Sequence, residues 1–161
     1  MREIKFRGKR EDNGEWVYGY LMRCTQCVTQ ELSVCIGSEF GLHEWVIPST
    51  VGQYTGLKDK DGKEIYEGDI TQLILPNYED YEARFFEVAI KTSVREKLIC
   101  YEGFEPGTAK VAITGVVFMW NGFDLFPCID DKGISDNEKM NVIGNIHDTP
   151  KSLENWWRED C

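Results

Sequence analysis

Short runs of alternating apolar and polar residues, separated by turn-forming residues, make up most of this chain. The clearest case joins residues 4–9 to residues 15–22 through Asn13-Gly14, because an Asn-Gly pair readily adopts the positive φ angles of a tight hairpin turn. A second such turn is predicted at Asn121-Gly122. The other predicted strands span residues 30–37, 43–48, 64–75, 85–92, 96–102, 109–120, 123–129 and 140–146. This pattern predicts a mainly β protein, an antiparallel meander plus a small β-barrel-like unit.

The end of the chain departs from this pattern. Thr149 can act as an N-cap and Pro150 as the first helical residue, so the stretch KSLENWWRED is predicted to form a short C-terminal helix that Asp148 helps to cap. Trp156 and Trp157 would lie on one side of it. We expect the two tryptophans to pack against the barrel-like unit, with an oligomer contact as the alternative.

A chain of 161 residues with 42% hydrophobic residues can form one ordinary core or two small ones. A boundary is predicted between an N-terminal meander, residues 1–50, and the barrel-like unit with its terminal helix, residues 51–161. A single compact domain is the alternative.

Charge is distributed unevenly along the chain. The formal net charge is −10, yet residues 1–10 sum to +4, so the remaining 151 residues sum to −14. An acidic body disfavours nucleic-acid binding over a broad face. The basic residues of the first strand could still bind single-stranded nucleic acid together with exposed aromatic side chains; they are Arg2, Lys5, Arg7, Lys9 and Arg10. The favoured interpretation of their alternation with Ile4 and Phe6 is a strand with one solvated face.

Neither an apolar membrane span nor the apolar core of a signal peptide is evident, which predicts a cytoplasmic protein without membrane association. Its six cysteines are then expected to be reduced thiols. A zinc site could be formed by Cys24, Cys27, Cys35 and His43, but this set has only one closely spaced pair. Ordinary cysteines are therefore favoured over zinc or a redox pair, and no cofactor is predicted.

The segment from Gln53 to Ile70 resembles a calcium-binding loop at first sight. If Gly62 held the sixth position of such a loop, the first and twelfth ligand positions would be Leu57 and Gly68, which offer no side-chain oxygen. The segment is instead predicted to form a hairpin with Asp61-Gly62 at its turn, followed by a bend. The residues expected to shape these turns are Gly56, Asp61, Gly62, Glu67, Gly68 and Asp69.

The carboxylates Glu64, Glu67 and Asp69 could also serve a metal-dependent hydrolase. No nucleophile, base and orienting group can be aligned around them, so we favour turn chemistry and predict no catalytic residues.

Four segments, residues 2–10, 16–21, 50–70 and 142–150, together resemble the YopX-like family of phage and prophage proteins, which is uncharacterised. The resemblance implies a β-rich, self-associating protein encoded by a phage or an integrated element, with no established activity. We therefore expect a non-enzymatic homo-oligomeric interaction module whose acidic surface binds a basic face of a host or phage protein. The single-stranded nucleic-acid binder and, behind it, the metal-dependent hydrolase are the alternatives.

Overall fold

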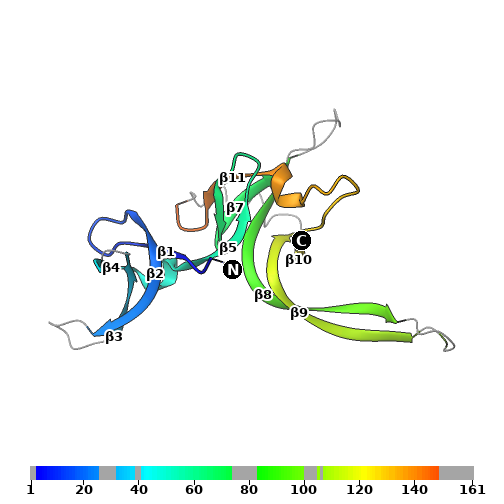
Figure 1. The fold of residues 1–161 in the computed structure, drawn as a ribbon, viewed down its shortest axis with the longest axis horizontal. Helices are drawn as coiled ribbons and strands as arrows, with labels where there is room; N and C mark the ends of the chain where they lie inside the picture. The colour runs from blue at the N-terminus through cyan, green and yellow to red at the C-terminus, as the bar shows by residue number, and fades with distance from the viewer. Residues whose placement is uncertain are drawn as a thin grey trace.

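A computed structural model describes residues 3–25, 32–38, 41–73, 83–99, 105 and 107–148 of the chain (Figure 1). The first sheet has six strands in the spatial order β4 (His43–Trp45), β3 (Leu32–Gly37), β2 (Trp16–Thr25), β1 (Phe6–Lys9), β5 (Gly52–Lys58) and β6 (Glu64–Tyr66). The second has five, in the order β10 (Phe123–Leu125), β9 (Gly107–Trp120), β8 (Arg84–Ile99), β7 (Asp69–Leu73) and β11 (Met140–Asn145). Two short 3-10 turns complete the described elements, η1 (Pro48–Thr50) and η2 (Asp136–Lys139).

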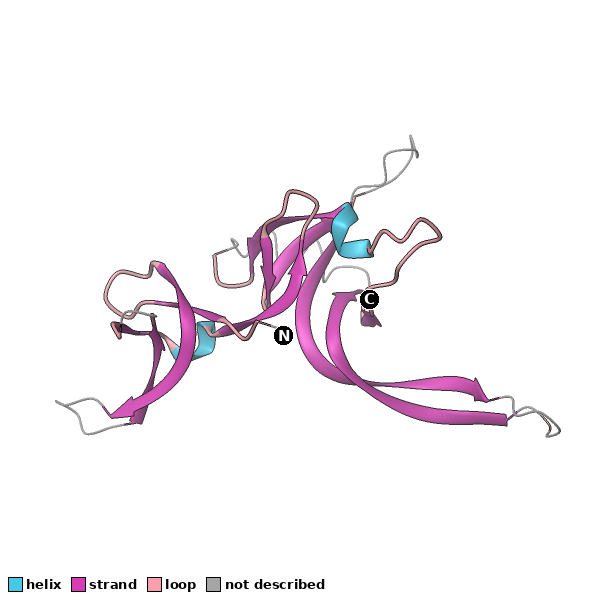
Figure 2. Ribbon diagram, viewed as in Figure 1, coloured by secondary structure: helices cyan, strands magenta, loops and turns pink. Residues whose placement is uncertain are grey.

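The mainly β prediction is confirmed, and strands with short connections dominate the ribbon (Figure 2). Both predicted Asn-Gly hairpins form. Gly14 has a φ of 73° between β1 and β2, while Asn121 and Gly122 have φ values of 45° and 76° between β9 and β10. At Asn121-Gly122 both central residues have positive φ, the geometry that matches the twist of the flanking strands. At Asn13-Gly14 only Gly14 has positive φ, and the connection is longer, because the pairing of β1 with β2 ends at Lys9 opposite Trp16.

The barrel-like unit is not found among the described residues. Both sheets are open: β4 and β6 lie at the edges of the first, and β10 and β11 at the edges of the second. Closure would require the two edge strands to pair, whereas β10 pairs with β9 and β11 pairs with β7. The predicted C-terminal helix, with Thr149, Pro150, Trp156 and Trp157, lies outside the described residues.

Residues 64–75, predicted as one strand with a bend, contribute strands to two different sheets. The chain leaves the first sheet after β6 and enters the second at β7. Gly68 lies between them with a φ of 77°, a conformation that other residues adopt only with strain. Its N–H donates to the carbonyl of Val88, and its carbonyl accepts from Ile146. The domain boundary at residue 50 stays a prediction, although β5 and β6 belong to the first sheet.

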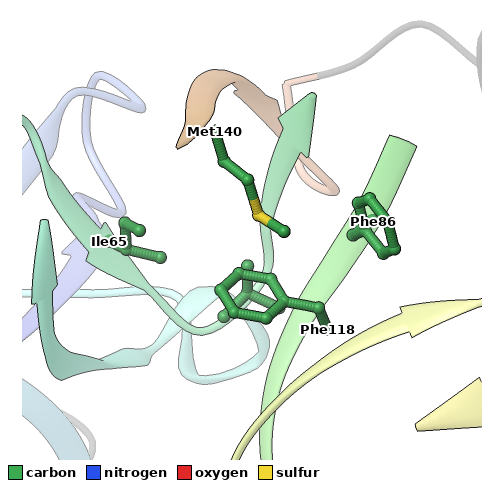
Figure 3. Close-up of a cluster of buried hydrophobic side chains, with 5 residues drawn as sticks. Ile65, Phe86, Phe118 and Met140 are labelled. Atoms are coloured by element: carbon green, nitrogen blue, oxygen red, sulfur yellow. The ribbon is translucent and has the colours of Figure 1, made fainter. Parts of the chain in front are cut away.

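The hydrophobic core joins the two sheets. Its buried residues are Ile65, Phe86, Val88, Phe118 and Met140 (Figure 3). Ile65 comes from β6 of the first sheet, while the others come from strands of the second. The rings of Phe86 and Phe118 meet edge to face at 6.3 Å. Burial of each large side chain contributes roughly 1.5–3 kcal/mol, so this shared core holds the sheets together.

Strands β8 and β9 continue far beyond this core as a two-stranded ribbon (Figure 1). Residues 85–92 and 96–102 were predicted as separate strands, but no glycine or proline interrupts residues 84–99, and they form one continuous strand. It pairs with β9 without a register shift from Glu87 opposite Met119 to Ile99 opposite Gly107. We call residues 91–99 and 107–115 the β8–β9 arm. No helix among the described residues is long and apolar enough to cross a membrane.

Candidate functional site

The described basic residues at the start of the chain each contact a carboxylate of their own chain. Lys5 lies 2.7 Å from Glu64, and Arg10 lies 2.6 Å from Asp12 and 3.3 Å from Glu44. Arg7 and Lys9 pair with Asp69 and Asp148, respectively. Arg2 lies outside the described residues. Four of the five cations predicted to form a possible nucleic-acid edge are therefore paired within the fold.

The Arg7–Asp69 pair is the most deeply buried of these. The Nη2 atom of Arg7 lies 2.7 Å from Oδ1 of Asp69 and donates to the carbonyl of Glu67 at 3.1 Å. The guanidinium also lies between two aromatic rings, 4.6 Å from the centre of Trp16 and 5.0 Å from that of Tyr66. A planar guanidinium suits both the carboxylate and the flanking rings. Because Arg7 belongs to β1 and Asp69 begins β7, this pair links the two sheets.

Burial raises the pKa of Asp69, while the nearby positive charge of Arg7 opposes that rise. The other carboxylate oxygen, Oδ2, accepts the backbone N–H of Tyr66 at 2.8 Å. Each oxygen thus has a donor, which is the condition for holding a carboxylate inside a protein.

The four segments that carry the family resemblance meet around this pair. Trp16 supplies one ring against Arg7, and its indole N–H donates to Asp148 at 2.6 Å. Asp148 in turn pairs with Lys9, and the His147 ring lies 6.0 Å from that of Trp16. We call this group the junction cluster; it comprises Arg7, Lys9, Trp16, Tyr66, Asp69, His147 and Asp148. Most of its donors and acceptors bind one another, although Nε of Arg7 is buried without a hydrogen-bond partner among the described residues. The cluster stabilises the junction between the sheets.

Protonation of the Asp148 carboxylate is expected to lower the free energy of unfolding at acid pH. Its partial burial favours a higher pKa, but hydrogen bonds from Asn145, Lys9 and Trp16 outweigh this and lower the pKa to about 2. A carboxyl with a lowered folded-state pKa stabilises above its unfolded value of 3.8, and that contribution is lost as the pH falls toward about 2. Because the side chain is partly exposed, we expect about 1 kcal/mol after solvent screening.

Chemical denaturation of wild type and Asp148→Asn should therefore differ by about 1 kcal/mol at pH 6 and converge near pH 2. An equal difference at both pH values would contradict this account of Asp148.

The carboxylates of the central hairpin accept backbone hydrogen bonds. Asp59, which is buried, accepts the N–H groups of Asp61 and Lys63 at 2.9 Å and that of Val142 at 3.0 Å. This side chain thus shapes its own turn and ties it to β11. Asp61 is exposed and contacts Lys60.

Glu67 and Glu64 are engaged in a similar way. Glu67 accepts the backbone N–H groups of Gln53 and Ile90, which belong to different sheets. Glu64 accepts the Tyr66 hydroxyl at 2.7 Å as well as Lys5. The three glycines predicted to shape the turns have positive φ angles, 83° at Gly56, 82° at Gly62 and 77° at Gly68. Gly56 lies within β5, where the pairing with β6 shifts register, and not in a turn. In the described part of the chain, no three His, Cys, Asp or Glu side chains gather as a metal site.

The candidate zinc ligands are only partly brought together. Cys24 and Cys35 lie on neighbouring strands with their Sγ atoms 2.8 Å apart. His43 instead packs edge to face against Trp45, with ring centres 5.7 Å apart. Cys27 lies outside the described residues.

The β8–β9 arm is a candidate interaction surface that sequence analysis missed. Three of its large apolar side chains are exposed, Val94 at 63%, Leu98 at 62% and Ile113 at 40%. The one feature of the sequence that indicates the arm is the uninterrupted strand pattern of residues 84–99. This strand of 16 residues is longer than the strands of most globular proteins. An arm with apolar side chains in water favours contact with another surface.

Comparison with known proteins places the chain in a family. The family model described as "YopX protein" matches residues 5–154. Among solved structures, the chain is similar to the crystal structure of protein EF1440 from Enterococcus faecalis, with 25% identity and a TM-score of 0.47. That match covers 95% of this chain and 99% of the other. No curated protein matches the chain. Since the family model spans nearly its whole length, the chain belongs to the YopX family.

Proposed function

We propose that this protein is a non-enzymatic interaction module that self-associates through the β8–β9 arm. The observation that carries the proposal is the arm itself, a long two-stranded ribbon with exposed Val94 and Leu98. An isolated two-stranded ribbon is only marginally stable in water, whereas a third strand or a packed surface stabilises it. A second copy of the chain would supply that surface.

The distribution of charge favours a second copy of the chain as the partner that binds the β8–β9 arm. Residues 91–99 and 107–115 carry four cations and one carboxylate, for a net charge of +3 in a chain of −10. The connecting residues 100–106 add Glu102 and Glu105, so the positive charge is confined to the paired strands. Lys91 pairs with Asp124 of its own chain. Attraction between the other cations of these strands and the acidic body of a neighbouring copy would assist assembly.

The contacts of the first strand and of the central hairpin favour this proposal over the alternatives. A nucleic-acid edge on β1 would need available cations, and Lys5, Arg7, Lys9 and Arg10 are paired with carboxylates. A hydrolase site at Glu64, Glu67 and Asp69 would need convergent carboxylates, and these accept separate hydrogen bonds. A phage or prophage origin, a cytoplasmic location and a basic partner protein for the acidic surface remain parts of the proposal.

The test is a concentration series by sedimentation velocity with wild type and Leu98→Glu. We expect wild type to self-associate and Leu98→Glu to weaken that association at least about tenfold, because a buried leucine contributes roughly 1.5–3 kcal/mol to an apolar contact. Leu42→Glu is the matched control, since Leu42 is 71% exposed and lies off the arm. The control should assemble like wild type.

Two results would overturn the proposal. One is a wild-type protein that stays monomeric at about 100 μM, a concentration at which even a weak specific dimer is well populated. The other is a Leu98→Glu variant that assembles as tightly as Leu42→Glu. Far-UV circular dichroism of both variants establishes that they are folded.

A further inference from the structure

Cys24 and Cys35 form a thiol pair inside the first sheet. Cys24 lies opposite Ser33 in the β2–β3 pairing, and Cys35 lies opposite Met22. The two cysteines are therefore diagonal neighbours, and alternation of side chains along both strands places them on the same face. Their Sγ atoms are 2.8 Å apart, closer than two sulfur atoms in van der Waals contact.

The two thiols differ in access to solvent. Cys35 is fully buried and Cys24 is partly exposed. Burial, together with the neighbouring Cys24 thiol, raises the pKa of Cys35 to about 12. Thiolate is the reactive form of cysteine, so an oxidant that reaches this pair meets Cys24 first.

We propose that Cys24 and Cys35 are an oxidisable pair that closes into a disulfide and staples β2 to β3. With a low-molecular-weight disulfide such as oxidised glutathione as the oxidant, the Cys24 thiolate attacks one sulfur and displaces one glutathione thiolate. Cys35 gives up its proton to solvent and attacks the Cys24 sulfur of the mixed disulfide, displacing the second glutathione. Two protein thiols are thereby oxidised and one glutathione disulfide is reduced to two glutathione thiols.

This chemistry predicts an order of events. The glutathione adduct on Cys24 should appear first and then decay into the Cys24–Cys35 link, because Cys24 is partly exposed to the oxidant whereas Cys35 is buried. The link would close a short loop across the hairpin. We therefore expect the thermal midpoint of the oxidised protein to rise by roughly 5–10 °C over that of the reduced protein.

Peptide mapping can test this proposal on the full chain. The purified protein is incubated with oxidised glutathione, remaining thiols are alkylated, and the sample is digested with trypsin and a glutamate-specific protease. Cleavage after Arg23, Glu31 and Glu39 separates peptide 24–31, which holds Cys24 and Cys27, from peptide 32–39, which holds Cys35. We expect these two peptides to be joined, with Cys27 alkylated.

Three variants complete the experiment. Cys27→Ser should still form the link, whereas Cys24→Ser should lose both the link and the rise in thermal midpoint. Cys35→Ala should retain the glutathione adduct on Cys24. If this core substitution prevents folding, the proposal is judged from the loss of the link and of the rise in thermal midpoint in Cys24→Ser. A Cys24–Cys27 disulfide, a glutathione adduct that never resolves in wild type, or no reaction at Cys24 would each overturn the proposal.

Discussion

Replacing Arg7 with methionine is expected to lower the free energy of unfolding by about 3–5 kcal/mol, because the substitution leaves the Asp69 carboxylate buried without its cation. Methionine keeps much of the apolar contact with Trp16 and Tyr66 but removes the charge. Urea denaturation at pH 7 measures the loss. Lys5→Met is the matched control: its pair with Glu64 is partly exposed, so about 0–1 kcal/mol is expected.

The pH dependence of this loss of stability provides a second test of the Arg7–Asp69 pair. Burial already raises the pKa of Asp69, and removing Arg7 removes a group that lowers it. A carboxyl with a raised folded-state pKa favours the folded state below its unfolded value, and this benefit is lost as the pH rises through the folded pKa. The deficit of Arg7→Met should therefore shrink on acidification from pH 7 toward pH 4.

The double variant Arg7→Met/Asp69→Asn should recover part of the stability, because a neutral amide can still accept the N–H of Tyr66. A loss below about 1 kcal/mol for Arg7→Met, or one that does not change with pH, would contradict the assigned role of the junction cluster.

Replacing Asp59 with alanine should lower the free energy of unfolding by about 3 kcal/mol, since three backbone N–H groups lose their acceptor. Two of these belong to the hairpin turn and the third, from Val142, belongs to β11. The substitution should therefore weaken both the turn and its attachment to the second sheet. Amide hydrogen exchange at Val142 should accelerate together with the loss measured by denaturation.

Asp61→Ala is the control, because Asp61 lies in the same turn but is exposed and its side chain contacts only Lys60 among the described residues. We expect a change within about 0.5 kcal/mol. Burial favours a higher pKa at Asp59, but its three backbone hydrogen bonds outweigh this and lower the pKa below 3.8. Its contribution is present above that value and fades as the pH falls through the folded pKa, so wild type and Asp59→Ala should converge in acid. Equal losses for the two alanine variants would count against the structural role of Asp59.

The sequence by itself determined the mainly β character, the position of both Asn-Gly hairpins and the family. These features are local: side-chain alternation follows from backbone geometry within a strand, and an Asn-Gly pair readily forms a tight turn. The failure of the calcium-loop interpretation was equally accessible, because it depended only on the spacing of Leu57 and Gly68 from Gly62.

Only the tertiary structure decided which charges, thiols and sheets come together. The sum of charges in residues 1–10 does not reveal that Lys5 meets Glu64 or that Arg7 meets Asp69, because strand pairing creates those contacts across about sixty residues of chain. The approach of Cys24 to Cys35 depends on the register of β2 against β3, which a one-residue shift would abolish. The open sheets and the β8–β9 arm likewise depend on which strand edges pair, and an alternating pattern carries no information about that choice.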